Sequence, residues 1–500
     1  MVKLINKNKR SMGLITVMII IGLVTMFLSF LLNKIGIKST ITEPGTFETT
    51  VVTVRNIFSK EGLQYIFSDA IKNFRALEPL AIIVISLIGV SVLQFSGLLK
   101  HIFGGFKNVR PSFITFIVLF VSIISTVIGD YSYALFFPLF AILYQIAGRD
   151  PKLAIMTVFI GITAGYGAGL IYNYQDIVLG GLTQISAVEV IKGYVFNEWS
   201  MIFISIVATF VLATVGTILI EKNLVKRTKR EEEIELITSP QALRVTGLVF
   251  LVLLGGIVYS LIPGLPFSGL LLDSNSPNYI EKMFGVNAPF REGFLVIFAM
   301  VTLICGAVYG HISRNIKSSR EYNKAISVFF QGTGFIFAGL FFFSIMFGIL
   351  EWTGISTVLS LKLINLMANS QMTGIFLIIS MFFICIMVTM LNPNSLQNWT
   401  LASPIFVPLM MRANISPEFT QIIFSAADAV GKCFTPLYVF LIVMIGFLYK
   451  YDTQNEDIGL FGTMKKILPV VVWMALTWLI IIVGWNLLGF ALGFGTSTTL

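Results

Sequence analysis

The sequence predicts an all-α polytopic membrane protein, both from its composition and from the length of its apolar segments. Of its 500 residues, 56% are hydrophobic and only 12% are charged, and the mean hydropathy is +0.88. Soluble domains carry about 25% charged residues. Many apolar runs exceed the roughly 18 residues that a membrane-spanning helix needs, whereas a membrane β-barrel would show short alternating segments. We therefore expect helices throughout.

Apolar runs of spanning length follow one another along the whole chain. The first of them follows a basic stretch, but it shows no small-residue cleavage pattern, so we expect a span and not a signal peptide. The expected spans are 12–32, 79–99, 112–128, 131–147, 199–221, 243–262, 292–311, 325–349, 371–391, 419–449 and 467–492.

The basic residues indicate how the chain lies in the membrane. The formal net charge is +9, and most Lys and Arg residues stand in short loops between spans. Such loops face the cytoplasm, so we expect a plasma (inner) membrane protein with a cytoplasmic N-terminus. Segment 34–77 fits this rule poorly, because alternation places it outside although it carries basic as well as acidic residues. Topology explains the charge, so no nucleic-acid partner is expected.

The sequence does not contain the residues or motifs that several kinds of protein chemistry require. The three cysteines, Cys305, Cys385 and Cys433, lie in apolar segments without a CxxC partner, and the two histidines, His101 and His311, lie near loops. We therefore expect no histidine metal site. No P-loop and no HExxH-type or GxSxG-type motif is present, which argues against an ATP-driven pump and an intramembrane enzyme. We expect no enzyme activity and no cofactor.

A charged stretch divides the chain into two halves. "KNLVKRTKREEEIE" is its most hydrophilic part, and we expect a cytoplasmic linker at 222–242 between halves at 1–221 and 243–500. Each half contains one region too polar and too broken for a plain span, at about 153–181 and about 350–411. Interrupted segments at matching places in two halves are typical of secondary transporters built from inverted repeats.

These interrupted regions predict two re-entrant hairpins or broken helices that meet near mid-membrane. Non-helical backbone survives at that depth only where it is buried in protein or lines a wet cavity. In the first region, "GYGAG" places Gly165, Gly167 and Gly169 beside Asn173. A packing device of the GxxxG kind is one interpretation. We favour a hairpin tip whose backbone approaches a ligand.

The stretch "AADAVGKCFTP" carries two charges inside an apolar run. Asp428 and Lys432 are four residues apart, so they are neighbours on one helix face and can form a neutralising pair. Ionisable groups inside a bilayer are costly and are candidates for function. Lys432 would then meet an anionic substrate, or Asp428 would take a coupling cation or proton. Pro436 has no N–H for the carbonyl of Lys432, which leaves a backbone oxygen beside the pair.

Other polar residues leave two interpretations open. Asp176 follows the glycine-rich turn and is either a functional carboxylate or the N-cap of the next helix. Asp130 separates two apolar runs, where an apex cap explains it as well as function does. Trp399 stands among Asn394, Gln397 and Asn398, and it is either an interface anchor or part of a cavity lining.

Several long stretches resemble the p-aminobenzoyl-glutamate transporter (AbgT) family. They are "FSKEGLQYIFSDAIKNFRALEPLAIIVISLIGVSVLQFSGLL", "GDYSYALFFPLFAILYQIAGRDPKLAI", "NWTLASPIFVPLMMRANISPEFTQ" and the closing "LYKYDTQNEDIGLFGTMKKILPVVVWMALTWLIIIVGWNLLGFALGFG". The resemblance implies a secondary transporter, a bowl-shaped homodimer with roughly nine spans and two re-entrant hairpins per protomer. It also implies p-aminobenzoyl-glutamate or related folate pieces as substrates, sulfonamide export in some members, and a sodium or proton gradient as energy source.

The resemblance also implies site residues, and this chain departs from some of them. The family's site positions match Asp176, Trp399, Pro417, Asp428 and Pro436. Where the family has an arginine before the helix aspartate, this chain has Ser425, and Lys432 stands where a neutral polar residue is expected. Leu396 replaces an expected serine. The bare glycine tip offers few oxygen ligands, which puts a sodium ion near Asp176 in question.

Two functions follow from these observations. The first is a secondary active transporter of a small organic anion by ion-coupled alternating access, with Lys432 in place of the missing arginine as the carboxylate partner. The alternative keeps the fold and reverses direction, giving a proton-driven exporter of antimetabolite drugs such as sulfonamides. The expected partners are thus a small organic anion, the lipid bilayer and a second copy of the chain.

Overall fold

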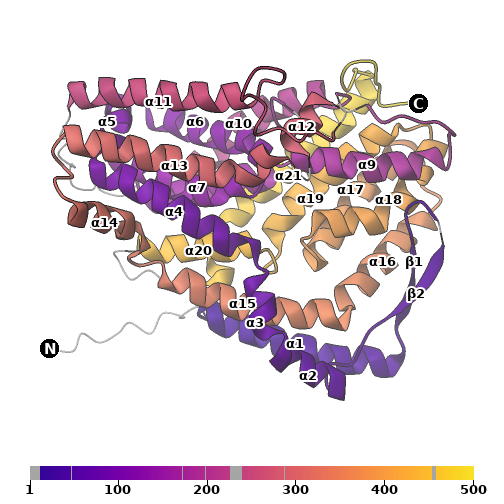
Figure 1. The fold of residues 1–500 in the computed structure, drawn as a ribbon. Helices are drawn as coiled ribbons and strands as arrows, with labels where there is room; N and C mark the ends of the chain where they lie inside the picture. The colour runs from indigo at the N-terminus through magenta and orange to yellow at the C-terminus, as the bar shows by residue number, and fades with distance from the viewer. Residues whose placement is uncertain are drawn as a thin grey trace.

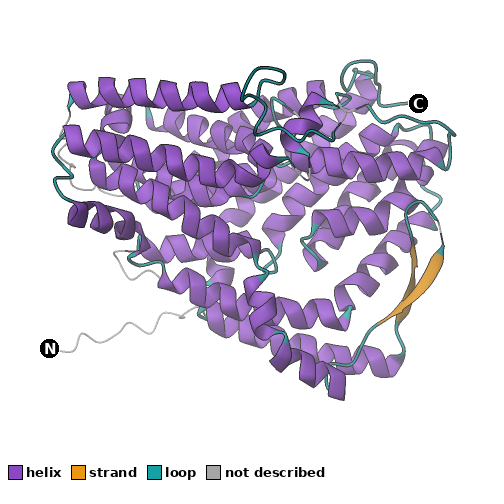
Figure 2. Cartoon of the chain, viewed as in Figure 1, coloured by secondary structure: helices purple, strands orange, loops and turns teal. Residues whose placement is uncertain are grey.

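The computed structural model is almost entirely helical, with one short two-stranded sheet (Figure 2). It describes residues 12–500 except 47, 172, 198, 226–238, 277, 286–287 and 453–457. Most of the expected linker at 222–242, and the basic residues before the first span, lie outside the described residues. The sheet pairs β1 (Lys38–Thr42) with β2 (Thr49–Thr53) in antiparallel register.

Nine described helices are long and apolar enough to cross a membrane, and a bent pair adds a further candidate. The bent pair is α19 (Pro417–Phe434) and α20 (Val439–Lys450), whose axes differ by 45°. This confirms the polytopic helical fold. The nine are α1 (Leu14–Ile35), α4 (Glu78–Ser96), α6 with η2 (Pro111–Ile128), α10 (Ile202–Asn223), α11 (Pro240–Ser260), α13 (Pro289–Ile312), α15 (Gly334–Thr353), α17 (Gly374–Leu391) and α21 (Leu460–Leu488).

Two sequence-based spans need correction. The run at 131–147 forms α7 (Tyr131–Ile146), whose 16 residues reach only about 24 Å against a hydrocarbon core of about 30 Å. The run at 325–349 starts later, at Gly334, because α14 (Ser319–Ser327) and η3 (Val328–Phe330) occupy its beginning.

The remaining elements are shorter and connect or cover the spans. Intermediate ones are α8 (Pro151–Ala164), α9 (Tyr174–Val188), α16 (Ile355–Ala368) and α18 (Ser395–Arg412), and short ones are α2 (Lys60–Ser68), α3 (Ala70–Arg75), α5 (Leu98–Phe103), η1 (Gly104–Asn108) and α12 (Tyr279–Phe284). Figure 1 shows α11 at the edge of the bundle, where most of its side chains are exposed, as expected for a helix that faces lipid.

The same order of elements occurs once in each half. In the first half, α6 leads through a short break into α7, a tight turn leads into α8, and a second break precedes α9. In the second half, α17, α18, α19 and α20 follow in the same way, and α8 and α19 each pack against the first two helices of their own set. The recurrence agrees with the expected internal repeat, and the inverted relation of the halves stays a prediction.

The order of elements also shows which break of the first half takes the same place as which break of the second half. The glycine-rich stretch 165–173 matches the break at 435–438, and the Asn-Pro-Asn break at 392–394 matches Gly129–Asp130. Moreover, α8 packs on α6, α7 and α19, whereas α9 packs on α18 and α19. Because α8 and α9 have different main partners, 165–173 is the break of a discontinuous helix. Of the two arrangements predicted for this region, the packing favours a broken helix over a hairpin tip at Gly165, Gly167 and Gly169.

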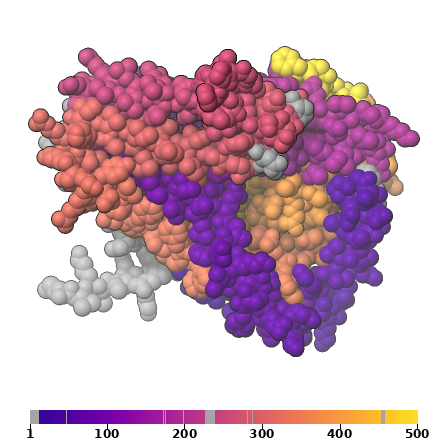
Figure 3. Space-filling view, viewed as in Figure 1, coloured from indigo at the N-terminus to yellow at the C-terminus, as the bar shows by residue number. Residues whose placement is uncertain are grey.

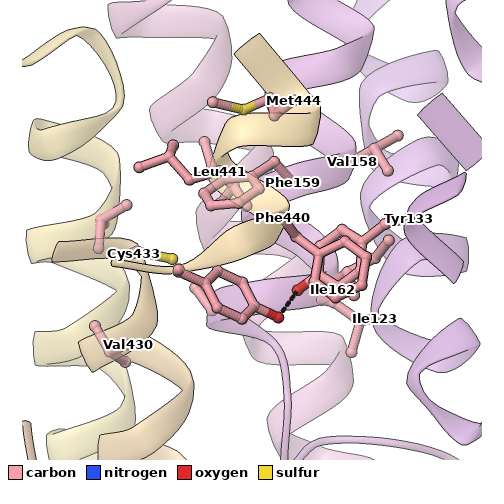
Figure 4. Close-up of a cluster of buried hydrophobic side chains, with 14 of the residues drawn as sticks. Ile123, Tyr133, Val158, Phe159, Ile162, Val430, Cys433, Phe440, Leu441 and Met444 are labelled. Carbon is pink, nitrogen blue, oxygen red and sulfur yellow. Dashed lines mark hydrogen bonds between the residues drawn. The ribbon is translucent and has the colours of Figure 1, made fainter. Parts of the chain in front are cut away.

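A buried aromatic cluster packs the break before α20 against two helices of the first half (Figure 4). The hydroxyl of Tyr133 on α7 lies 3.0 Å from that of Tyr438, which precedes α20, and 2.9 Å from that of Thr163 on α8. Its ring stacks on Phe440 with centroids 4.3 Å apart. All of these aromatic groups are buried. The break before α20 is thus fixed against α7 and α8.

Candidate functional site

A cavity of 490 Å³ lies where the helix breaks meet. Each of the four breaks contributes to its wall, through 127–131, Tyr166, 393–396 and 437–440. Figure 3 shows the molecule hollowed on this face, between indigo residues of the N-terminal helices and magenta to salmon residues of the middle of the chain, with orange residues at the floor. Breaks distant in sequence therefore build one site, as expected for backbone that is not helical at membrane depth.

The cavity wall combines many aromatic rings with a few charges. The rings come from both halves and are Tyr131, Tyr166, Phe284, Phe290, Phe294, Phe343, Phe347, Tyr438 and Phe440. The charged side chains are Glu78, Asp130, Arg291 and Lys432. Aromatic faces stack on planar ligands, and charged groups in such a wall fix the orientation of a polar ligand.

Lys432 lines the cavity and also takes part in a cluster of hydrogen bonds behind the cavity wall. Its Nζ lies 2.9 Å from Asp428 Oδ2 and donates to Ser395 Oγ at 2.5 Å. Ser395 Oγ also donates to Asp428 Oδ2 at 2.6 Å, and Thr389 Oγ1 donates to Asp428 Oδ1 at 2.8 Å. Asp428 is 1% exposed, so it lies behind the wall while Lys432 and Ser395 form part of it.

The ends of two helices stabilise the charges of this cluster, and a third helix packs closely beside them. Asp428 accepts from Ser395 in the first turn of α18, where the positive end of the helix dipole favours a carboxylate. Lys432 lies in the last turn of α19, which favours a cation. Gly431 allows the approach of α17, because a Cβ there would lie 2.8 Å from Cβ of Thr389. The glycine at position 431 thus allows Thr389 to approach Asp428 within hydrogen-bond distance.

Two tyrosines flank the ammonium group of Lys432. Its Nζ lies 5.2 Å from the ring centroid of Tyr166 and 5.7 Å from that of Tyr438. Both distances lie within the range of cation–π attraction. Tyr166 belongs to the break after α8, and Tyr438 to the break before α20. The charge of Lys432 is therefore surrounded by groups from both halves of the chain.

The other predicted residues near the second-half breaks have different places. Asn394 lines the cavity and caps α18 by accepting from the N–H of Gln397. Asn398 is fully buried and donates to the carbonyl of Asn392, which fixes the break instead of lining the cavity. Pro436 lies in the break that follows α19. Pro417 begins α19, about 16 Å along the helix from Asp428, and has no part in the cluster.

Trp399 is a buried link between helices. It is 0% exposed, and its Nε1 donates to the carbonyl of Leu179 at 3.2 Å and to Thr183 Oγ1 at 3.0 Å. Its ring stacks on Phe424, with centroids 4.6 Å apart. It thus connects α18 with α9 and α19. Neither the interface anchor nor the cavity-lining interpretation of this residue fits that position.

Asp176 lies apart from the Lys432 cluster. It stands in the first turn of α9, where Asn173 is the N-cap and accepts from the backbone N–H of Asp176 at 2.9 Å. The carbonyl of Asp176 accepts from Gln421 Nε2 at 3.0 Å. Its side chain is buried, and only its neighbours Gln175, Val178 and Leu179 line the cavity. The cap at this helix is therefore Asn173, and Asp176 is left as a buried carboxylate.

The glycine-rich break packs against α19 at the position of the missing arginine. Gly167 has a φ of +91°, and a Cβ there would lie 3.3 Å from Cβ of Ser425. A Cβ on Gly165 would collide with Ile123 of α6 and with the carbonyl of Gly161. Ser425 is buried, and its hydroxyl has no hydrogen-bond partner in the described part of the chain. These glycines serve close packing, and Gly169 lies in the same break.

Sequence reasoning missed several residues of the site. Ser395 and Thr389 bind Asp428 from other helices, and no spacing along the chain indicates such contacts. A serine was expected at Leu396, and Ser395 directly precedes that position. This neighbouring hydroxyl was the one feature of the sequence that could have indicated Ser395 as a site residue. Glu78 and Arg291 stand near helix starts and look like ordinary end charges. Asp130, left open above, lines the cavity.

Known proteins resemble this chain along nearly its whole length. The p-aminobenzoyl-glutamate transport protein of Escherichia coli (strain K12) is 24% identical over 485 residues, which cover 95% of this chain and 92% of that protein. The solved Alcanivorax borkumensis YdaH transporter matches 96% of this chain and 100% of its own, with 22% identity and a TM-score of 0.50. Neisseria gonorrhoeae MtrF matches 96% of each chain, with 23% identity and a TM-score of 0.49.

A family model decides the classification. The model described as the AbgT putative transporter family matches residues 10–500, which is nearly the whole chain. Together with the spans, this makes the protein a multi-pass membrane transporter and not an enzyme. The resemblance inferred from the sequence is thereby confirmed: the chain belongs to the AbgT putative transporter family.

Proposed function

We propose that this transporter is a secondary active carrier of a small organic anion that contains an aromatic ring. The observation that carries the proposal is the position of Lys432, a buried ammonium in the wall of a cavity where four helix breaks meet. Such a charge is costly at membrane depth unless it has a use. Alternating access around this site would expose the cavity to each side in turn.

The size and lining of the cavity support an aromatic carboxylate as cargo. Its volume of 490 Å³ falls in the range of roughly 300–1,000 Å³ that is usual for small-molecule sites. The ammonium of Lys432 pairs with a carboxylate, and the tyrosine and phenylalanine rings stack on a planar ring. The related Escherichia coli protein is described as a p-aminobenzoyl-glutamate transport protein, and that molecule has both groups.

Lys432 takes the role that we assigned to the missing arginine. An ammonium is a compact point charge without the bidentate fork of a guanidinium, so it holds a carboxylate with less geometric demand. Glu78 and Asp130 add acceptors to the same wall, which suits amine or amide donors elsewhere in the cargo. The substrate class is therefore a polar aromatic acid, p-aminobenzoyl-glutamate or a smaller carboxylate.

Coupling to a sodium or proton gradient completes the proposal. Asp176 is a buried carboxylate near the wall, and Asp428 is a second one. A proton acting on either carboxylate, or a sodium ion acting near Asp176, would couple the gradient to movement of the cargo. The second candidate function, proton-driven export of antimetabolites such as sulfonamides, uses the same aromatic lining with the opposite direction of transport.

Assembly and orientation remain proposals as well. The segments after α4 and α13 are both basic, and they lie at neighbouring helix ends: Asn315 donates to the carbonyl of Ser96 at the end of α4, and His101 of α5 is hydrogen-bonded to Tyr309 of α13. Their gathering at one end of the bundle supports the cytoplasmic assignment of that end and of the N-terminus. We propose a homodimer in the plasma (inner) membrane.

Uptake of radiolabelled p-aminobenzoyl-glutamate into proteoliposomes tests the proposal. The wild type should accumulate the label, and Lys432→Ala should lose uptake because the carboxylate has no partner. Trp399→Phe is the matched control, since Trp399 does not line the cavity, and it should retain transport. Unchanged uptake by Lys432→Ala would overturn the assignment.

The direction of transport is read in the same vesicles. A gradient that drives label inward, and whose collapse by an uncoupler stops uptake, indicates import. Label leaving preloaded vesicles in exchange for protons, with sulfonamides as competing cargo, indicates the exporter.

A further inference from the structure

The cluster around Lys432 contains the kinds of oxygen atom that bind a cation. Asp428 Oδ2 and Ser395 Oγ adjoin a buried point at the cavity wall, and Thr389 holds the other oxygen of the carboxylate, Oδ1. Pro436 leaves the carbonyl of Lys432 without its helical N–H, so a backbone oxygen is close by in sequence. Oxygen atoms of these kinds are the ligands that hard cations such as sodium use.

The ammonium group of Lys432 already occupies this point. It is 2.9 Å from Asp428 Oδ2 and 2.5 Å from Ser395 Oγ, which are contact distances. A sodium ion beside the same oxygens would stand close to the Lys432 charge, where repulsion between like charges is strong in a poorly hydrated site. The rings of Tyr166 and Tyr438 further favour a cation at the position of Nζ.

We propose that Lys432 is a tethered cation that takes the place of an inorganic monovalent cation at Asp428. Sodium therefore does not bind at this carboxylate, and Asp428 stays charge-balanced throughout the transport cycle. The consequence for transport, that sodium does not act through Asp428, rests on the proposed function. The binding statement itself does not, because it concerns only the cluster.

Removing the lysine side chain should convert the cluster into a sodium site. Lys432→Ala vacates the volume of the ammonium and frees Asp428 Oδ2 and Ser395 Oγ next to the cavity. Lys432→Met is the matched variant, because it removes the charge while its long side chain still fills the space. Asp428→Asn combined with Lys432→Ala removes the carboxylate that the ion needs.

The experiment is a thermal-unfolding measurement on the purified full chain, comparing sodium chloride with choline chloride at equal ionic strength. Lys432→Ala should gain a sodium-specific increase in midpoint of about 2 °C or more over the wild type, since a bound ion stabilises the folded state. Lys432→Met and the double variant should not gain it. Lys432→Ser serves the same purpose if Lys432→Ala gives no stable protein.

Two results would overturn the proposal. One is a sodium response of Lys432→Ala and Lys432→Ser that equals that of the wild type. The other is a wild-type sodium response that Asp428→Asn abolishes, because sodium would then bind Asp428 beside the lysine. Failure of anion transport in proteoliposomes would affect neither result, so the two proposals are tested separately.

Discussion

At the scale of single residues, the charged pair of the site was predictable and its partners were not. Asp428 and Lys432 are neighbours on one helix, so their spacing in sequence predicts their contact. Ser395 and Thr389 complete the cluster from α18 and α17, and only the packing of these helices brings them near. The sequence left Trp399 as an interface anchor or part of a cavity lining, and the structure instead gives it a buried position that links helices.

Trp399→Phe should lower stability and leave substrate affinity unchanged. The substitution keeps the ring that stacks on Phe424 and removes the indole N–H that donates to Leu179 and Thr183. Loss of a buried hydrogen bond costs about 1–3 kcal/mol. Thermal unfolding should show a lower midpoint, while the KM of transport stays at the wild-type value. A large increase in KM at wild-type stability would show instead that Trp399 contacts the cargo.

Thr389→Val should weaken the support of Asp428 without changing the shape of α17. Valine is close in size to threonine but cannot donate to Asp428 Oδ1, which leaves that oxygen with one donor fewer. Hydrogen bonds to charged groups contribute about 1.5–3 kcal/mol. We expect a lower unfolding midpoint and slower transport. Thr477→Val is the control, because that hydroxyl is exposed and donates only within its own helix, and it should leave both properties unchanged.

At the scale of elements, the sequence indicated two of the four interruptions, and the order of elements suggests a different correspondence between them. Both interrupted regions predicted from glycine, asparagine and proline contain a break, whereas the break at 435–438 divides what was predicted as one span, 419–449. Their correspondence depends on which helices pack together, and that depends on contacts between distant residues. The expected pairing joined the glycine-rich stretch 165–173 with 392–394, whereas the order of elements joins it with 435–438.

Gly431→Ala tests the close packing of α19 on α17. The added methyl group would lie 2.8 Å from Cβ of Thr389 and 3.1 Å from the carbonyl of Ile386, so the helices must separate. Overpacking costs about 1–3 kcal/mol, and here it also pulls Thr389 away from Asp428. Both the unfolding midpoint and the transport rate should fall. Gly247→Ala on α11, where a Cβ meets nothing within 4 Å, should reduce neither.

At the scale of the whole molecule, hydropathy predicted the architecture well and the site less well. Long apolar runs identify spans because the bilayer sets their length. The short α7 was mistaken for a span because its residues are as apolar as those of a true span. The cavity collects residues from four breaks, and no local pattern encodes that convergence.

Accessibility of the cavity can be followed with an introduced cysteine. The three native cysteines are buried, so their background reaction should be low. Leu396 lines the cavity and is 48% exposed, and Leu396→Cys should react with a polar maleimide. Bound substrate should slow that reaction. Leu401→Cys on the same helix replaces a buried residue and should stay unreactive. Equal labelling with and without substrate would place the cargo elsewhere.

The most direct test is the affinity of the purified protein for p-aminobenzoyl-glutamate, measured by isothermal titration for the wild type and for Lys432→Met. A charge-assisted contact to the cargo carboxylate predicts a loss of about tenfold or more in affinity, corresponding to about 1.4 kcal/mol, while Trp399→Phe binds as the wild type does. Equal affinity of Lys432→Met and the wild type would contradict the account, because Lys432 would then serve Asp428 alone.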